Sequence, residues 1–347
     1  MNKVLIVGHD GGWNLEASYA RAFRRQSSEV FFWDSGRALA LAARGRQFGR
    51  LVSRLVDVEP WKRKANLELI ELTSRLRPDL MLVISTEGLR AGTIGQIRAL
   101  LPRMPIYCLF PDTPHNLTPE RIQCLPMFDR VITVSPFWID CFHRLGARCV
   151  SYLPLAADTE LHHPMADHIS PEKKLAFIGN WRPERETILA ELAEHDLEIW
   201  GSYYWRRRTN SDSVVRQHWM GREAVGNEFA AVCASHKILL NLIDSVGWPG
   251  PNMRAFEHAA CAGFSLTTRT PALLDVFTEG DNIECFESVE EAKDKIRFYL
   301  QNETARRRIA AASYDKVVHG GHAYGDRVKQ LMKWAVDHRP MHSRIEG

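Results

Sequence analysis

Short apolar runs alternate with longer amphipathic stretches along almost the whole chain, and this rhythm constrains the fold more than any other feature. A strand that helices cover on both faces reads as a continuous apolar run, whereas a surface helix carries an apolar stripe. The alternation is therefore typical of βαβ units built on mostly parallel sheets. Strands are expected at residues 4–7, 30–33, 80–84, 106–110, 131–134 and 149–153, and again at 175–178, 197–200, 238–243, 265–268 and 283–286.

A proline-rich stretch divides this pattern into two halves. Residues 154–171 read PLAADTELHHPMADHISP and lack periodicity, as expected of a connection. We predict an α/β protein with two Rossmann-like, doubly wound parallel-sheet domains that face a central cleft, because ligands of such sheets bind outside the carboxyl ends of the strands. The predicted division is an N-terminal domain at 1–156, a linker at 157–172, a C-terminal domain at 173–321, and a final helix at 322–340 that packs back on the N-terminal domain.

Composition and charge exclude several classes of protein. The formal net charge of +3 is too small for general polyanion binding, so no nucleic-acid partner is expected. The seven cysteines form no CxxC pair, which indicates reduced thiols. The N-terminus lacks a signal-peptide pattern, and no apolar run approaches the ~20 residues of a membrane span. We therefore expect a cytoplasmic protein with at most peripheral membrane association, rather than an exported two-lobed binding protein.

The stretch at residues 37–64 is rich in lysine and arginine, opposed by Asp57 and Glu59. Its apolar positions roughly follow helical spacing, which favours a helix packed on the sheet with a basic outer face. Contact with an anionic acceptor or a membrane surface is the alternative interpretation.

The most informative segment is NLIDSVGWPGPNMRAFEHAACAG at residues 241–263, which joins a buried strand to a helix through a glycine- and proline-rich loop. The free N–H groups at the start of such a helix suit an anionic phosphate. Asn252 stands at that start, and Arg254 and Glu257 lie three residues apart on one helix face. The arginine can bind a diphosphate and the carboxylate can accept ribose hydroxyls. An intrahelical surface ion pair between the two is the equally open alternative.

A second glycine turn opens the first helix of the C-terminal half. Its candidate phosphate-binding residues are Gly179, Asn180, Arg182 and Arg185. The two arginines either reach a diphosphate or simply flank a helix start as solvated side chains. The run at 205–208 is interpreted as a solvated loop. His162 and His163 in the linker lack metal-ligand spacing and are also interpreted as solvated.

Three loops of the N-terminal half follow expected strands and meet at one sheet edge. The first contains Asp10, Gly11 and Gly12, and is not a GxGxxG dinucleotide fingerprint. It is interpreted either as a plain strand-to-helix turn or as a loop that approaches a bound ligand. Glu87 follows the third expected strand. Asp112 and His115 follow the fourth, where an Asx turn made by Asp112 is the alternative to a catalytic role.

The C-terminal half resembles the CgeB-like branch of the group 1 glycosyltransferases, which is similar to the large retaining GT-B family. The resemblance is carried by FIGNWRPERETIL, EIWGSYYW, ILLNLID, PNMRAFEHAACAGFSLTT and AYGDRVKQLMKWA, across about residues 175–335. It implies a GT-B fold with donor binding in the C-terminal domain and acceptor binding in the N-terminal one. It also implies that Glu257 contacts the donor ribose. The wider family often has a second acidic residue eight positions earlier, where this chain has Pro249.

The resemblance implies a hexosyltransferase-like enzyme that moves a sugar from a nucleotide-sugar, with UDP favoured, to a hydroxyl of a glycan, a lipid-linked sugar or a protein. Asp112 is the first choice for the residue that receives the hydroxyl proton, and His115 the second. No cofactor is expected. No metal is expected either, because the arginines and helix N-termini can neutralise the diphosphate. A nucleotide-sugar epimerase of the same architecture is the alternative function.

Overall fold

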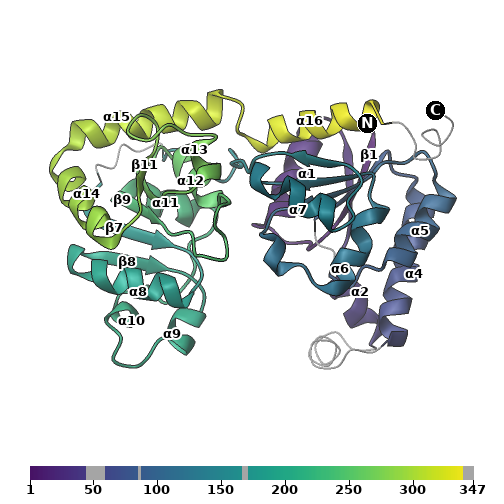
Figure 1. The fold of residues 1–347 in the computed structure, drawn as a ribbon, viewed down its shortest axis with the longest axis horizontal. Helices are drawn as coiled ribbons and strands as arrows, with labels where there is room; N and C mark the ends of the chain where they lie inside the picture. The colour runs from purple at the N-terminus through teal and green to yellow at the C-terminus, as the bar shows by residue number, and fades with distance from the viewer. Residues whose placement is uncertain (44–58, 85–86, 166–170, 339–347) are drawn as a thin grey trace. The chain divides into compact units, whose positions relative to one another are not determined.

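The computed structural model describes residues 1–43, 59–84, 87–165 and 171–338. The chain divides into two compact units. Unit 1 comprises Met1–Pro154 together with the C-terminal segment from Gly325, and unit 2 comprises Leu155–Tyr324. Each unit is a parallel sheet flanked by helices (Figure 1). The predicted class, two doubly wound α/β sheets, is confirmed.

Unit 1 contains a six-stranded parallel sheet in the order β2-β1-β3-β4-β5-β6. Its interior strands are almost fully buried, as their apolar runs predicted. The strand order reverses between β1 and β3, so the loops after these two strands lie at the switch point of the sheet. The strands are β1 (Lys3–Val7), β2 (Glu29–Trp33), β3 (Leu80–Val83), β4 (Ile106–Phe110), β5 (Arg130–Thr133) and β6 (Val150–Tyr152).

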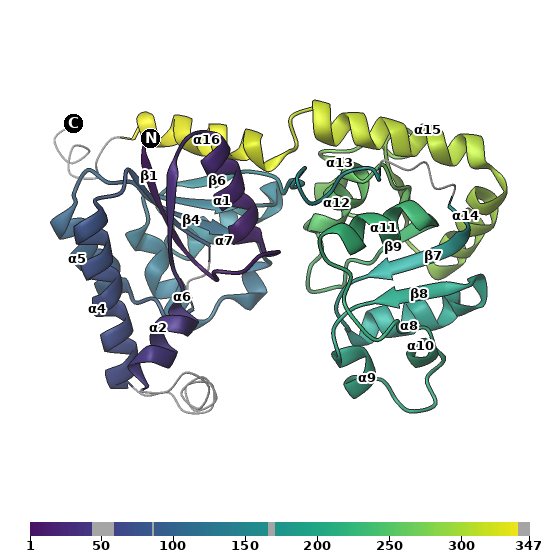
Figure 2. The same ribbon diagram turned by 180° about the vertical axis from the view of Figure 1, so that it is seen from behind.

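The helices of unit 1 include the last helix of the chain, α16 (Tyr324–Val336), which passes near one end of α1 in both views (Figures 1 and 2). Arg327 donates a hydrogen bond from Nε to the carbonyl of Pro154 at 2.7 Å. Val328 and Leu331 are fully buried, as their apolar spacing on the helix predicts. The other helices are α1 (Leu15–Arg25), α2 (Ser35–Ala42), α4 (Glu59–Leu76), α5 (Ala91–Leu100), α6 (Pro119–Cys124) and α7 (Ile139–Arg144). Most of the basic stretch at 37–64 lies outside the described residues.

Unit 2 contains a five-stranded parallel sheet in the order β11-β10-β9-β7-β8. Successive residues of β7 enter opposite cores, with Leu175 and Phe177 on one face and Ala176 and Ile178 on the other. The strand order reverses between β7 and β9. The strands are β7 (Lys173–Ile178), β8 (Leu197–Trp200), β9 (His236–Asn241), β10 (Ser265–Thr268) and β11 (Glu284–Phe286).

One segment of unit 2 differs from its predicted structure. The run at 205–208 is not a solvated loop but part of helix α9 (Tyr204–Arg208), and Trp205 is fully buried. Its indole N–H donates to the carbonyl of Gly179 at 2.8 Å, which fixes α9 beside the end of β7. The remaining helices are α8 (Pro183–Leu192), α10 (Val214–Gln217), α11 (Asn227–Ser235), α12 (Met253–Ala260), α13 (Pro271–Leu274), α14 (Val289–Gln301) and α15 (Glu303–Tyr314).

Candidate functional site

The switch point of unit 2 brings together the loops that follow β7 and β9. The Gly179 loop leads into α8, and residues 242–252 lead into α12. Gly201, at the end of β8, packs against the same loop so closely that an added Cβ would lie 2.2 Å from the carbonyl oxygen of Gly179. The backbone is therefore tightly packed where strand ends meet, and the polar side chains project from this base.

Arginines gather around Asp244 at this point. Arg182 and Arg185 lie 3.7 and 3.5 Å from the Asp244 carboxylate, with side-chain exposures of 62% and 17%. Arg185 also donates to the carbonyl of Asn180 at 3.1 Å, while its Nε has no hydrogen-bond partner among the described residues. Burial lowers the pKa of Arg185; Asp244 opposes this, and Arg182 and Arg254 add to it. Arg182 and Arg185 therefore share the single carboxylate of Asp244.

The two loops are fastened to each other by Glu184, the second residue of α8. Its carboxylate accepts hydrogen bonds from the backbone N–H of Ser245, at 2.8 Å, and from the Ser245 hydroxyl. These bonds hold the pKa of Glu184 below its usual value. The helix start after β7 and the loop after β9 consequently form one continuous surface.

Helix α12 supplies the remaining candidates. The side-chain amides of Asn252 and Asn241 exchange two hydrogen bonds, at 2.9 and 2.6 Å, so Asn252 is already engaged at the helix start. Arg254 donates from Nε to the carbonyl of Ile178 at 2.9 Å and from Nη1 to Glu257. Arg254 and Glu257 thus form an ion pair within the helix. Glu257 is only 7% exposed, so the pair is not on the surface and the carboxylate is buried in the core.

The buried Glu257 carboxylate is ionised. Burial by itself raises its pKa, but Arg254 and then His162 lower it, and the net shift is downward. A buried charge of this kind is tolerated only when partners compensate it. One of the partners, His162, was interpreted as solvated, and that interpretation is wrong. Its side chain is 11% exposed and its Nε2 lies 3.8 Å from Oε1 of Glu257.

In unit 1, the loop after β1 is organised mainly by its own neighbours. His9 donates its backbone N–H to Glu16 at 3.1 Å, and the Asp10 backbone N–H donates to Asp34 at 3.1 Å. Gly12 accepts a hydrogen bond from Arg21 at 3.0 Å, and Gly11 packs near Asn14, which caps α1. The His9 ring lies 4.0 Å from Glu87, so the loops after β1 and β3 meet at the switch point.

Asp112 and His115 lie together in the turn after β4. Asp112 accepts from the Thr113 backbone at 2.8 Å and from the Asn116 amide at 2.6 Å. His115 Nδ1 is 3.2 Å from the Thr113 hydroxyl. Among the described residues, the hydrogen bonds of Asp112 and His115 stay within residues 112–116. Both side chains are exposed, so a turn-forming role accounts for their present contacts while leaving them accessible.

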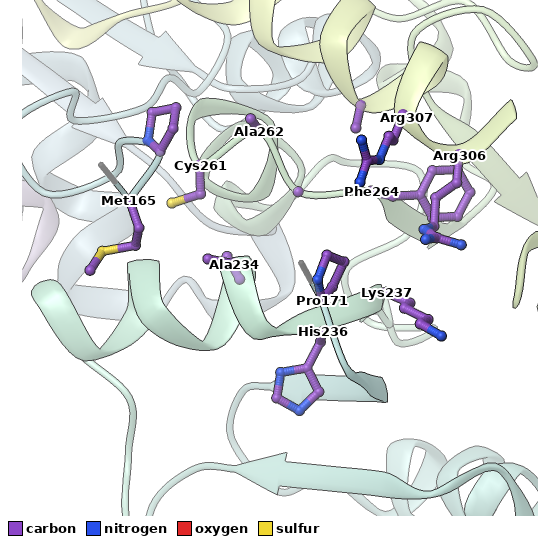
Figure 3. Close-up of a pocket in the computed structure, with 14 residues that line it drawn as sticks. Met165, Pro171, Ala234, His236, Lys237, Cys261, Ala262, Phe264, Arg306 and Arg307 are labelled. Atoms are coloured by element: carbon purple, nitrogen blue, oxygen red, sulfur yellow. The ribbon is translucent and has the colours of Figure 1, made fainter. Parts of the chain in front are cut away.

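A separate hollow of about 440 Å³ lies at the opposite edge of the unit 2 sheet (Figure 3). Its lining includes His236 and Lys237 at the start of β9 and the two cysteines Cys233 and Cys261. Ligands of doubly wound sheets bind at the carboxyl ends of strands, whereas this hollow lies at the amino ends. Within the described parts of the chain, no group of three or more metal-binding side chains occurs, and no helix is long and apolar enough to cross a membrane.

Comparisons with known proteins point to one class. A family model described as "Glycosyl transferase-like" matches residues 182–333. The spore protein CgeB of Bacillus subtilis (strain 168) is 21% identical over 229 residues, which cover 62% of this chain and 70% of CgeB. The matched region of the family model contains the arginine cluster and Glu257.

Solved structures share the architecture over nearly the full length. Sucrose-phosphate synthase from Thermosynechococcus elongatus has a TM-score of 0.71 at 11% identity, with 97% of this chain and 100% of that chain covered. Anabaena Alr3699/HepE in complex with UDP-glucose has a TM-score of 0.67 at 12% identity, with 96% and 99% covered. At such identities the likeness shows the fold, which is GT-B.

Fold and family model together define the class: the chain is a glycosyltransferase of GT-B fold. Within that class the C-terminal half is similar to CgeB, as the motifs around α8 and α12 implied.

Proposed function

We propose that this enzyme transfers a sugar from a UDP-sugar to a hydroxyl of an acceptor, which is a glycan, a lipid-linked sugar or a protein. The observation that carries the proposal is the arrangement at the switch point of unit 2, where Arg182 and Arg185 flank Asp244 and Arg254 bonds the buried, ionised Glu257. Guanidinium groups at strand ends suit a diphosphate. HepE, which shares the fold, was solved with UDP-glucose bound, and this supports the choice of UDP.

The donor is placed by the chemistry of its parts. The diphosphate lies against Arg182 and Arg185, with the backbone of Gly179 and Asn180 and the starts of α8 and α12 nearby. The ribose hydroxyls donate to Glu257. Asn252, locked to Asn241, fixes the start of α12 rather than moving to meet the ligand.

The transfer step needs no metal ion in this proposal. The acceptor oxygen forms a bond to the anomeric carbon as the bond from that carbon to the β-phosphate oxygen breaks. The departing UDP carries negative charge, which the arginines stabilise where it develops. Metal independence is therefore part of the proposal, and activity in the presence of a chelator tests it. Loss of transfer with chelator and recovery with magnesium or manganese would contradict it.

Unit 1 is proposed as the acceptor side and unit 2 as the donor side. Asp112 is the proposed general base: its hydrogen bonds to Thr113 and Asn116 hold the exposed carboxylate in place to receive the hydroxyl proton. His115 is the second candidate. Asp10, Gly11, Gly12 and Glu87 are proposed to contact donor or acceptor from the neighbouring loops.

Calorimetric titration with UDP, CDP, GDP and ADP, followed by turnover of UDP-glucose and related sugars, tests the function. We expect UDP to bind most tightly and sugar to be transferred only when an acceptor is present. Conversion of a nucleotide-sugar into its epimer without acceptor would identify an epimerase instead. Absence of binding to every nucleoside diphosphate would overturn the proposed donor site.

A further inference from the structure

The side chain of His162 reaches the buried carboxylate of Glu257 from a distant part of the sequence. Its Nε2 lies 3.8 Å from Oε1, and the two side chains are 11% and 9% exposed. Arg254 bonds the other carboxylate oxygen, Oε2. Each carboxylate oxygen of Glu257 thus lies near a nitrogen of a different side chain.

A tight turn in the backbone of unit 2 presents His162 to this site. The backbone N–H of His162 donates to the carbonyl of Asp158 at 2.7 Å, and Asp158 is only 4% exposed. The preceding residue, Ala157, forms a parallel bridge with Ala323. The placement of His162 is therefore set by contacts within unit 2.

The ring of Phe229, on α11, packs against both His162 and Arg254. The His162 ring meets it edge-on, with centroids 5.0 Å apart and planes at 63°, and the Arg254 guanidinium lies 5.0 Å from the same ring. His258 stacks on Phe229 at 5.9 Å. Burial, followed by Arg254, lowers the pKa of His258 to about 3, so His258 stays neutral and adds no charge beside Glu257.

His162 acts on Glu257 in a way that Arg254 alone does not. Arg254 divides its guanidinium between Glu257 and the carbonyl of Ile178. His162 contributes separately to the lowered pKa of Glu257, against the effect of burial. A carboxylate that is already ionised and oriented binds hydroxyl groups without a further ordering cost.

We propose that His162 is a positioning residue of the donor site, which holds the Glu257 carboxylate in the orientation that accepts the ribose hydroxyls. The inference rests on the proposed function, because Glu257 is there assigned to the ribose. The motifs that carry the family resemblance around Glu257 do not include His162, which lies in the segment between the two sheets.

Calorimetric titration with UDP tests the role in four single variants and one double variant. His162→Phe keeps a ring against Phe229 and removes the nitrogens, whereas His162→Gln keeps an N–H donor. We expect His162→Phe to weaken UDP binding about tenfold, because Oε1 of Glu257 loses its neighbouring polar nitrogen, and His162→Gln to recover most of that loss. The matched control is His163→Phe, since His163 Nδ1 contacts only its neighbour Pro164 at 3.1 Å among the described residues. The UDP affinity of this control should equal that of wild type.

A double variant tests whether His162 acts through Glu257. In a Glu257→Gln background, adding His162→Phe should change UDP affinity less than about twofold.

Two results would overturn the inference while leaving the donor site intact: wild-type affinity in folded His162→Phe, or the same loss with and without Glu257→Gln. If circular dichroism shows that His162→Phe is unfolded, His162→Leu takes its place with the same expected results. Wild-type protein that binds no nucleoside diphosphate would overturn the proposed function as well, so the two failures are distinguishable.

Discussion

The candidate residues of unit 2 and the two proposed catalytic residues of unit 1, Asp112 and His115, differ in how far along the chain their contacts reach. In unit 2, Arg254 reaches the end of β7, Glu184 reaches the loop after β9, and His162 reaches Glu257. In unit 1, Asp112 and His115 bond within their own turn. Contacts between distant segments prearrange a ligand site, whereas local contacts alone do not distinguish a catalytic turn from an ordinary one. The structure therefore supports the donor side more strongly than the acceptor side.

The largest expected effect is that of a substitution at Asp112, and it would support the site of unit 1 as strongly as that of unit 2. Asp112→Asn preserves the shape of the turn and removes the base, so turnover at saturating acceptor should fall by roughly 10²–10⁴-fold while UDP affinity is unchanged. Steady-state kinetics and UDP titration measure the two quantities separately. Near-normal turnover would reduce Asp112 to a turn residue and move the search to His115, Glu87 or Asp10.

Removal of Glu257 tests the unit 2 side of the comparison. Glu257→Ala should weaken UDP binding by roughly ten- to a hundredfold, because charged hydrogen bonds are worth about 1.5–3 kcal/mol. Because Glu257 is buried beside Arg254, the variant should also be less stable, and Glu257→Gln serves as the better-folded companion. Glu290→Ala, an exposed carboxylate on α14, is the matched control and should bind UDP normally. Unchanged affinity in folded Glu257→Gln and Glu257→Ala would remove the ribose role.

The two arginines near Asp244 should contribute unequally. Arg185 is more buried than Arg182, with side-chain exposures of 17% and 62%, so its charge is less screened. We expect Arg185→Gln to weaken UDP binding about tenfold and Arg182→Gln only about twofold. Titrations at two salt concentrations check the order, and a larger loss in Arg182→Gln would contradict this view of the cluster.

The smallest expected effect is on stability, and it concerns the packing of the backbone at Gly201 in unit 2 and at Gly12 in unit 1. Gly201→Ala would bring a Cβ within 2.2 Å of the Gly179 carbonyl, whereas nothing lies within 4 Å of a Cβ at Gly12 in unit 1. Gly201→Ala should therefore lower the free energy of unfolding by about 1–3 kcal/mol, as overpacking does, and Gly12→Ala should change it by less than about 0.5 kcal/mol. Chemical denaturation measures both. Equal stability of the two variants would show that the loops of unit 2 are not tightly packed.

The same contrast between local and distant contacts explains what the sequence predicted well. The strands of both sheets follow from their apolar runs, because burial on both faces leaves a pattern that needs no partner to be recognised. The loop before α12 follows from its glycines and prolines for the same local reason, although the helix begins only at Met253, after Pro251. Helix α9 was missed because three arginines follow Trp205 and mask the single residue that anchors the helix in the core.

Side chains that join distant segments were the ones that sequence reasoning placed poorly. His162 stands in a stretch without periodicity, and its contact with Glu257 exists only once the turn at Asp158 packs against α12. The exchange of hydrogen bonds between Asn241 and Asn252 also depends on the path of the loop between them. Spacing identified Arg254 and Glu257 as a pair, but their burial is a property of the assembled unit.

A crystal structure of the protein with UDP tests the central claim most directly. The account predicts density for the diphosphate against Arg182 and Arg185, and for the ribose hydroxyls within hydrogen-bond distance of Glu257. Density for UDP at the amino ends of the strands instead, in the hollow lined by Cys233 and Cys261, would contradict it.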